Sequence, residues 1–229
     1  MPHALSPTPY ATRNTFHASR ITYHVLRFTF YVLLLTLPLF LLACTRVEPV
    51  VKIGLVGPFE GRERAIGYDA IYSARLAVRE INEAGGINGQ RVALVALDDG
   101  GQPDLAEAAA RSLALDPDVV LVVGHWLEET TAVAAPIYLE ASLPFIPMGQ
   151  PPFVGGDPAG LPAAFHEAYT AVTPFDETAG PHAGPTYDAF QLIWQALAAV
   201  PASPASRTDL QTALRGLHYE GMTGTVYVP

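Results

Sequence analysis

The sequence predicts an α/β fold in which a doubly wound parallel sheet carries helices on both faces. Short runs rich in β-branched and apolar residues, at 50–57 and 92–97, are typical of buried strands. Between them, apolar residues recur at helical spacing and stop at Gly85 and Gly86, where a left-handed helix cap is expected. Strand, helix and strand in this order form a right-handed βαβ unit, and the chain repeats that unit as far as Met148.

The remaining elements of this first half follow in order. Pro103 suits the first position of a helix, which the Asp-Pro-Asp sequence at 116–118 ends. Five apolar residues at 119–123 predict a third buried strand. A further helix is expected over 127–141, and a fourth short strand over 144–147.

The amino-acid composition changes where the second half of the chain begins. Residues 150–162 are rich in proline and glycine and predict a linker. Helices are expected over 163–171 and 187–200, and Thr208 with Gln211 forms a capping box for a last short helix. A turn and a short strand close the chain. The side chains expected in the core are Leu76, Ile81, Leu94, Val95, Val120, Val122 and Ile193.

Residues 1–43 are expected to be a secretory signal outside the fold. Its long basic region holds a seven-residue repeat, Arg-x-Thr followed by an aromatic residue, to which we assign no function. The sequence Leu-Leu-Ala-Cys at 41–44 resembles a lipobox, in which Cys44, the one cysteine of the chain, carries the lipid. Residues 44–49 would then be a lipidated tether. A transmembrane anchor is the alternative, but the uncharged run at 28–43 is shorter than the roughly 20 residues that a spanning helix needs.

Composition and missing motifs exclude several classes of protein. The chain has 229 residues and a formal net charge of −9, so we expect no nucleic-acid partner, because phosphate binding needs a basic face. We find no dinucleotide fingerprint, phosphate loop or nucleophile elbow, and the seven histidines lack metal-ligand spacing. Asp98 and Asp99 follow a strand, where such residues more often order a loop than bind a metal. We therefore expect no enzyme, catalytic residue, cofactor or metal.

Several motifs together resemble one family. AVREINEAGGING, then a strand, then LDDGGQPDLAEAAARSL, then a strand ending Val123-Gly124-His125, is similar to the first lobe of type I periplasmic solute-binding proteins. Within that family the similarity is greatest to the branched-chain amino-acid-binding (Leu/Ile/Val-binding) group, the receptors of ABC importers. Residues 50–149 carry the resemblance as a first-lobe α/β domain. Residues 163–229 resemble, more weakly, the helices and strand that complete that lobe, and the linker stands in place of the family's second lobe.

The resemblance also places a ligand site. In the family, the charged head of the ligand is held at the N-terminus of the helix after the third strand, where free N–H groups and the helix dipole favour an anion. Carried over by position, or lying beside such positions, six residues are expected to contact a ligand: Ile66, Trp126, Glu128, Thr130, Gly149 and Pro151.

These positions depart from the family's chemistry. Glu128 stands where the family has a hydroxyl, and with Glu129 it would repel a ligand carboxylate; alternatively, both are simply favourable acids in the first turn of a helix. Thr130 and Thr131 are near enough to substitute for that hydroxyl. Trp126 is either a stacking surface for the ligand or half-buried packing.

The resemblance implies an exported substrate-binding lipoprotein of an ABC-type, branched-chain-like amino-acid importer. It would lie on the outer side of the cytoplasmic membrane or in the periplasm, anchored to the membrane by its lipid. Its partners would be an ABC permease and a small-molecule solute, an amino acid or a related polar compound. Two alternatives stay open: an exported protein-interaction or sensor domain that uses the same lobe, and an internally deleted remnant that binds nothing.

Overall fold

The computed structural model describes residues 23–34, 49–200 and 204–228. The contacts divide the chain into two units, Met1–Val47 and Glu48–Pro229. Each unit is described by itself below.

The first unit contains one described helix, over residues 23–34, whose side chains are exposed. A membrane-spanning helix, which would need greater length and apolar character, is not found among the described residues. The expected lipobox at 41–44, with Cys44, lies outside the described residues, as does most of the expected signal.

The second unit alternates strands and helices through its first half and is mostly helical in its second. In chain order its elements are β1 (Val50–Gly57), α2 (Arg64–Glu83), β2 (Arg91–Asp98), α3 (Pro103–Leu115), β3 (Val119–Gly124), α4 (Glu128–Glu140), β4 (Phe145–Pro147), a 3₁₀ turn (Pro158–Gly160), α5 (Ala163–Thr170), α6 (Ala183–Ala199), α7 (Arg207–Leu214), β5 (His218–Gly221) and β6 (Gly224–Tyr227).

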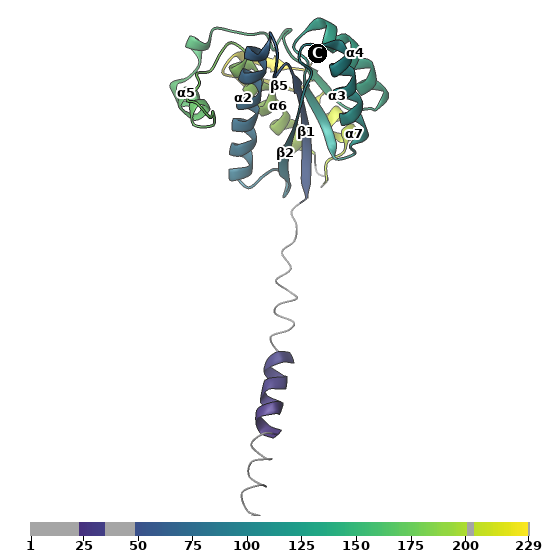
Figure 1. The fold of residues 1–229 in the computed structure, drawn as a ribbon, viewed down its shortest axis with the longest axis vertical. Helices are drawn as coiled ribbons and strands as arrows, with labels where there is room; N and C mark the ends of the chain where they lie inside the picture. The colour runs from purple at the N-terminus through teal and green to yellow at the C-terminus, as the bar shows by residue number, and fades with distance from the viewer. Residues whose placement is uncertain (1–22, 35–48, 201–203, 229) are drawn as a thin grey trace, which may run out of the picture. The chain divides into compact units, whose positions relative to one another are not determined.

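Strands β1 to β4 form a parallel sheet in the order β2-β1-β3-β4. In Figure 1, α2 and α6 lie on one side of this sheet and α3 and α4 on the other. Strands β5 and β6 pair separately as an antiparallel hairpin. The predicted α/β fold, with a parallel sheet and helices on both faces, is therefore confirmed.

Two clusters of buried side chains fill the two faces of the sheet. On one face, Ile53 of β1 packs in the same cluster as Leu76 of α2 and Ile193 of α6. On the other, Val122 of β3 packs in the same cluster as Leu113 of α3. Because α6 contributes to the first cluster, a helix from the second half of the chain closes the core begun by the first half.

The core was predicted only in part. Leu76, Val120, Val122 and Ile193 are buried, as expected. Ile81, Leu94 and Val95 are only partly buried, because β2 is an edge strand and Ile81 lies in the last turn of α2. The prediction was wrong because sequence spacing gives the face of a strand but not its place in the sheet.

Three predictions for the C-terminal elements need correction. Helix α6 begins at Ala183, one turn earlier than expected. The cap of α7 is Ser206, whose hydroxyl accepts a hydrogen bond from the backbone N–H of Asp209, so the expected capping box of Thr208 and Gln211 does not form. The closing segment is a hairpin of two strands rather than a turn and one strand.

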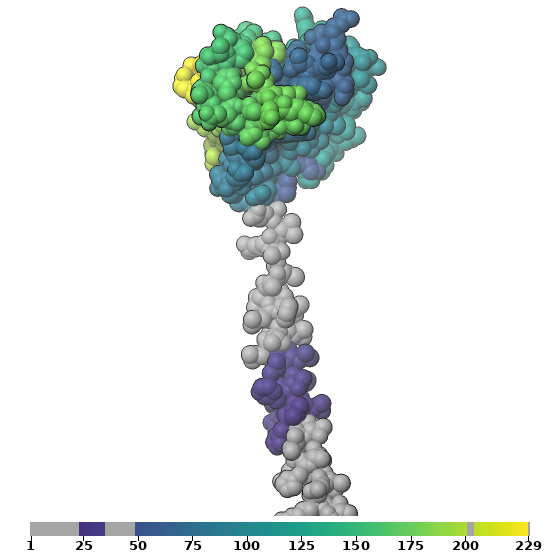
Figure 2. All heavy atoms as spheres, turned by 60° about the vertical axis from the view of Figure 1, so that its left-hand side comes forward, coloured from purple at the N-terminus to yellow at the C-terminus, as the bar shows by residue number. Residues whose placement is uncertain are grey.

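The segment after β4 lies against α2. Figure 2 shows it in green beside the blue of that helix. The buried carboxylate of Asp69, on α2, accepts hydrogen bonds of 3.0 Å from the backbone N–H groups of Gly180 and His182. Tyr169, on α5, packs edge-on against Tyr72 of α2. These contacts fix a long irregular segment to the helix that follows β1.

Candidate functional site

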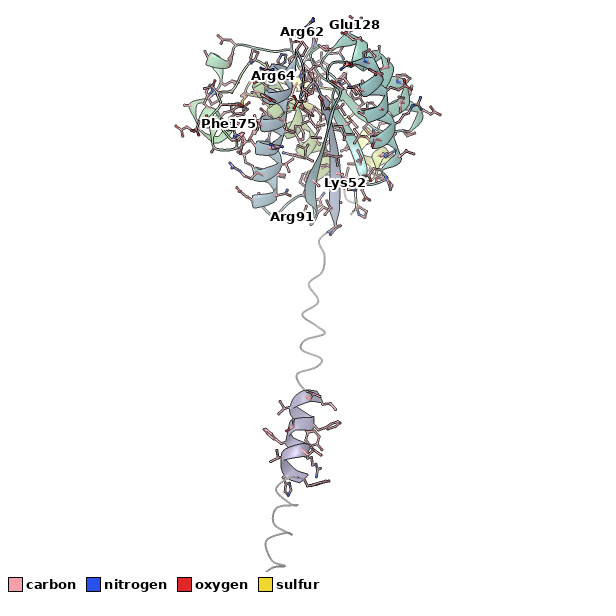
Figure 3. The ribbon with its side chains drawn as sticks, viewed as in Figure 1. Lys52, Arg62, Arg64, Arg91, Glu128 and Phe175 are labelled. Carbon is pink, nitrogen blue, oxygen red and sulfur yellow. The ribbon has the colours of Figure 1, made fainter. Side chains whose placement is uncertain are left out.

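The carboxyl ends of β3 and β4 frame a hollow of about 400 Å³ beside the first turn of α4. In an open parallel sheet this edge is where ligands bind. Figure 3 shows Glu128 at this end of the sheet, and Lys52 and Arg91 at the other end. The residues that line the hollow are Trp126, Leu127, Glu128, Thr131, Ala132, Met148, Gly149 and Gln150.

Trp126 occupies this site because β1 ends in glycine. A Cβ added to Gly57 would lie 2.8 Å from the six-membered ring of the indole, so any side chain there would displace it. Only 6% of Trp126 is exposed, and its indole N–H has no hydrogen-bond partner among the described residues. The indole N–H of Trp194, in the core, also lacks a partner in the described part of the chain, and both nitrogens are covered. Trp126 is therefore a candidate for contact with a ligand because it lines the hollow.

The turn after β4 approaches Trp126 from the other side. Gly149 has a φ of +75°, and a Cβ there would collide with the carbonyl oxygen of Trp126. Glycine is therefore required at this position by both conformation and space. The next residue, Gln150, is exposed and lines the hollow. The adjacent Pro151 is exposed but does not line it.

The hydroxyl groups of α4 are held by the backbone. Thr130 is fully buried and donates to the carbonyl of Leu127 at 3.0 Å, so its hydroxyl does not line the hollow. Thr131 does line it, while donating to the carbonyl of His125 at 3.2 Å. The exposed Glu128 and Glu129 occupy the first turn of α4, which no side chain caps.

A buried polar network holds the strand ends beneath the site. His125 is fully buried, with Nδ1 2.8 Å from Asp99 Oδ2 and Nε2 3.1 Å from the hydroxyl of Tyr138. Burial also raises the pKa of Tyr138, so this hydroxyl stays protonated. The network joins the ends of β2 and β3 to α4, and thereby fixes the peptide that carries Trp126.

Two backbone N–H groups of the loop after β1 already donate hydrogen bonds to a side chain of the protein. Asp98 Oδ1 accepts hydrogen bonds from the backbone N–H groups of Phe59 at 2.7 Å, Glu60 at 3.2 Å and Gly100 at 3.0 Å. Ile66, expected in that loop, lies instead in the first turn of α2, where it is partly buried against the core. Within the described parts of the chain, no group of three His, Cys, Asp or Glu side chains could hold a metal ion.

The structure thus brings three of the six expected residues together: Trp126, Glu128 and Gly149. It adds Thr131 and Gln150 to the lining. The contribution of Gln150 could not be read from spacing, because it depends on how the turn after β4 is held over Trp126.

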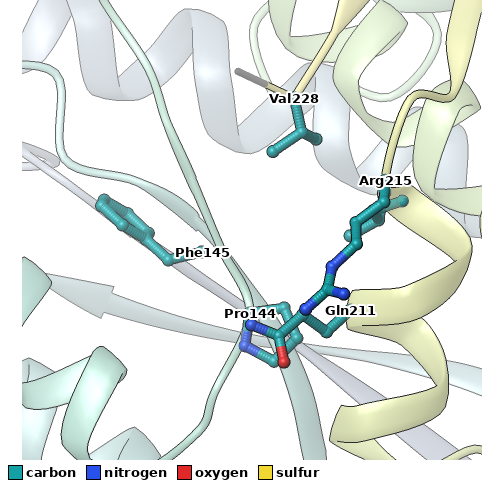
Figure 4. Close-up of a pocket in the computed structure, with 6 residues that line it drawn as sticks. Pro144, Phe145, Gln211, Arg215 and Val228 are labelled. Atoms are coloured by element: carbon teal, nitrogen blue, oxygen red, sulfur yellow. The ribbon is translucent and has the colours of Figure 1, made fainter.

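A second hollow, of about 220 Å³, lies at the amino end of β4. Pro144, Phe145 and Leu214 give it an apolar floor, and Arg215, the residue after α7, reaches over it toward Gln211 (Figure 4). An adjoining hollow of about 540 Å³ shares Pro144, Phe145 and Gln211 with it. Both lie away from the carboxyl edge of the sheet, so we do not assign them a ligand.

A family described as "Periplasmic binding protein" matches residues 50–180, more than half of the chain. Curated relatives include an amino acid binding protein of Pseudomonas aeruginosa, 38% identical over 93 residues (41% of this chain and 25% of the relative). A Leu/Ile/Val-binding protein homolog of Brucella abortus is 33% identical over 90 residues (39% and 24%). The aligned segment therefore spans about a quarter of the length of these relatives.

Two solved structures share the fold. One is the branched-chain amino acid transporter substrate binding protein of Streptococcus pneumoniae in complex with isoleucine, with a TM-score of 0.64 and 17% identity over 78% of this chain and 91% of that chain. The other is a solute binding protein of an ABC transporter from Rhodopseudomonas palustris in complex with 3,4-dihydroxybenzoic acid, with a TM-score of 0.63 and 14% identity over 78% and 88%. At this level of identity the likeness shows the fold alone.

Proposed function

Because this chain belongs to the periplasmic binding protein family, we propose that it is the substrate-binding component of an ABC-type importer for an amino acid or a related polar solute. The observation that carries the proposal is the hollow at the carboxyl ends of β3 and β4, which is lined by Trp126 and by the polar side chains of Thr131 and Gln150. Such a site suits a small molecule that offers both an apolar surface and hydrogen-bonding groups. We assign no catalytic residue.

Export and anchoring belong to the same proposal. A receptor for an importer must meet its solute outside the cytoplasmic membrane, and a lipid on Cys44 would keep it beside the permease. The support for this step is the sequence Leu-Leu-Ala-Cys at 41–44 and the basic, apolar segment before it.

The affinity is expected to be low. The described residues form one four-stranded sheet and one hairpin, so a solute at this edge is covered from one side. Tight pockets bury roughly 70–90% of a small ligand, and a half-covered one offers few contacts to offset the entropy of association. We therefore expect dissociation constants near or above the millimolar range, equivalent to about −4 kcal/mol.

Isothermal titration of the purified protein with leucine, isoleucine and valine tests the proposal. Trp126→Ala should abolish binding. Trp194→Phe is the matched control, because Trp194 lies in the core on α6 and does not line the hollow. Micromolar binding by a monomer would contradict the expected affinity, and micromolar binding by a dimer alone would mean that a second copy covers the solute. No binding of any solute would overturn the proposed function.

A second function has one observation in its favour. Leu115 is 84% exposed and lines, with Ile137, a shallow hollow between α3 and α4, whereas Leu139, 78% exposed, lines a separate hollow beside α4. Exposed apolar side chains of this kind can mark a protein contact, as in an interaction or sensor domain. Substituting both leucines with serine should leave solute binding unchanged. It should weaken self-association or partner capture only if this second function is correct.

A further inference from the structure

The hollow beside α4 carries one charged side chain. Of the residues that line it, Glu128 is acidic, and the others are apolar or neutral. No lysine or arginine is among them. Glu129, the next residue, is also exposed in the same helical turn.

The helix terminus does not reverse this balance. The macrodipole of a helix is equivalent to roughly +0.5 of an elementary charge at its N-terminus. Glu128 alone contributes −1 next to it, and Glu129 adds a second negative charge. The local field therefore favours a cation, although the bare helix terminus would favour an anion.

The loop after β1, with the first residue of α2, adds no net positive charge. Arg62 and Arg64 lie at the same end of the sheet as Glu128 (Figure 3), but Glu60 and Glu63 balance them. The backbone donors of this loop at Phe59 and Glu60 are held by Asp98, which already places a carboxylate where an incoming one would bind. A ligand carboxylate would meet this charge as well as Glu128 at the same edge of the sheet.

Trp126 supplies the second half of the recognition. Its six-membered ring rests on Gly57 and its indole N–H is covered, so a solute in the hollow meets the aromatic surface and not this donor. An aromatic face attracts a cation. With Glu128 beside it, a neutral group is favoured over a carboxylate.

We propose that the solute presents to this hollow a protonated amine and a neutral carbonyl, in place of the free carboxylate of an amino acid. Glu128 is the specificity-determining residue: it attracts the amine and repels a carboxylate but not a neutral carbonyl, while Trp126 offers an aromatic surface. Amino-acid amides and the amino ends of short peptides have this chemistry. The inference rests on the proposed function, since it names the class of solute for the same site.

Three probes of similar shape differ in charge: leucinamide, leucine, in which a carboxylate replaces the amide, and 4-methylpentanamide, which lacks the amine. At about pH 6 an α-amino group, with an ordinary pKa of about 8, is protonated. The chain has two tryptophans, so in a Trp194→Phe variant the fluorescence reports on Trp126 alone. Calorimetry on the unchanged protein gives the same constants should that variant fold poorly.

We expect leucinamide to bind about fivefold tighter than either other probe, as one exposed charge a few ångströms away would produce. Glu128→Gln should equalise leucinamide and 4-methylpentanamide. Glu140→Gln is the matched control, since Glu140 is exposed at the other end of α4. Leucine binding as tightly as leucinamide would overturn the inference and leave the proposed function standing. If none of the three probes bound, both would fall.

Discussion

Nδ1 of His125 lies 2.8 Å from Oδ2 of Asp99, and both side chains are buried. This pair connects the residue after β3 to the residue after β2, the two strands that flank β1. It therefore holds in place the peptide that leads into Trp126 and α4. The geometry of the proposed site depends on a contact between residues that touch no solute.

Asp99→Ala should lower the free energy of unfolding by about 3 kcal/mol, because it leaves a buried imidazole nitrogen without a partner. Urea denaturation followed by circular dichroism measures it. Glu107→Ala is the control, since Glu107 forms only an exposed pair with Arg111 and should cost under about 0.5 kcal/mol. Equal effects of the two substitutions would show that the buried pair does not stabilise the fold.

Arg207 should be the more important of two arginines at the ends of α7. It donates to the backbone carbonyls of Val119, Ala141, Ala114 and Asp116, at 2.7 to 3.2 Å. Arg207→Ala would leave these acceptors without that donor and should cost about 3 kcal/mol of folding free energy. Arg215→Ala, on the exposed end of the same helix, should cost under about 0.5 kcal/mol. A thermal melt that ranks them in the opposite order would contradict this assignment.

The stability should depend on pH through Asp188, which is buried on α6. Its carboxylate accepts hydrogen bonds from the backbone N–H groups of Met222 and Thr223 and from the Thr223 hydroxyl. Burial raises the pKa of this carboxyl above its ordinary 3.8, although those hydrogen bonds act in the opposite direction. Since the folded state then binds the proton more tightly, the contribution is full below pH 3.8 and is lost as the pH rises through the raised pKa.

Asp188→Asn removes this titration while Asp69 still titrates in both proteins. The difference in unfolding free energy between the unchanged protein and the variant should therefore increase as the pH falls from about 7 to about 4.5. Chemical denaturation at several pH values measures that difference. A difference that stayed constant, or that increased with rising pH, would show that Asp188 does not titrate as its burial indicates.

Cys44→Ser should release the protein from membranes, because the lipid of a lipobox is carried by that cysteine. Membrane fractionation of cells that express the variant and the unchanged protein measures it. Retention of the variant in the membrane fraction would instead indicate that the apolar run at 28–43 anchors the chain.

The parts of the fold set by local sequence could be predicted. Gly85 and Gly86 take the positive φ values expected after α2, and Pro103 begins α3. The predictions that were wrong concerned features that depend on tertiary contacts. Leu94 is partly exposed because its strand lies at the sheet edge. Helix α7 is capped by Ser206 because that hydroxyl, rather than that of Thr208, reaches the helix terminus.

The site was predicted to the same extent. Glu128 begins the helix after β3, and Gly149 lies in the turn after β4. Their place at the hollow could therefore be expected from sequence order. Thr130 could not, because its side-chain direction depends on the pitch of α4 and places its hydroxyl on the carbonyl of Leu127. Pro151 does not line the hollow, because the turn after β4 brings the side chain of the preceding residue, Gln150, to it instead.

The central claim, that this lobe carries a solute site at Trp126, is tested most directly by the indole N–H signals in a ¹⁵N-correlated NMR spectrum. The chain has two tryptophans, so two such signals are expected. Added leucinamide should shift the Trp126 signal with a dissociation constant near the millimolar range and leave that of Trp194, in the core, in place. A Trp126 signal that stays unchanged at about tenfold that concentration of leucinamide, leucine, isoleucine or valine would contradict the account.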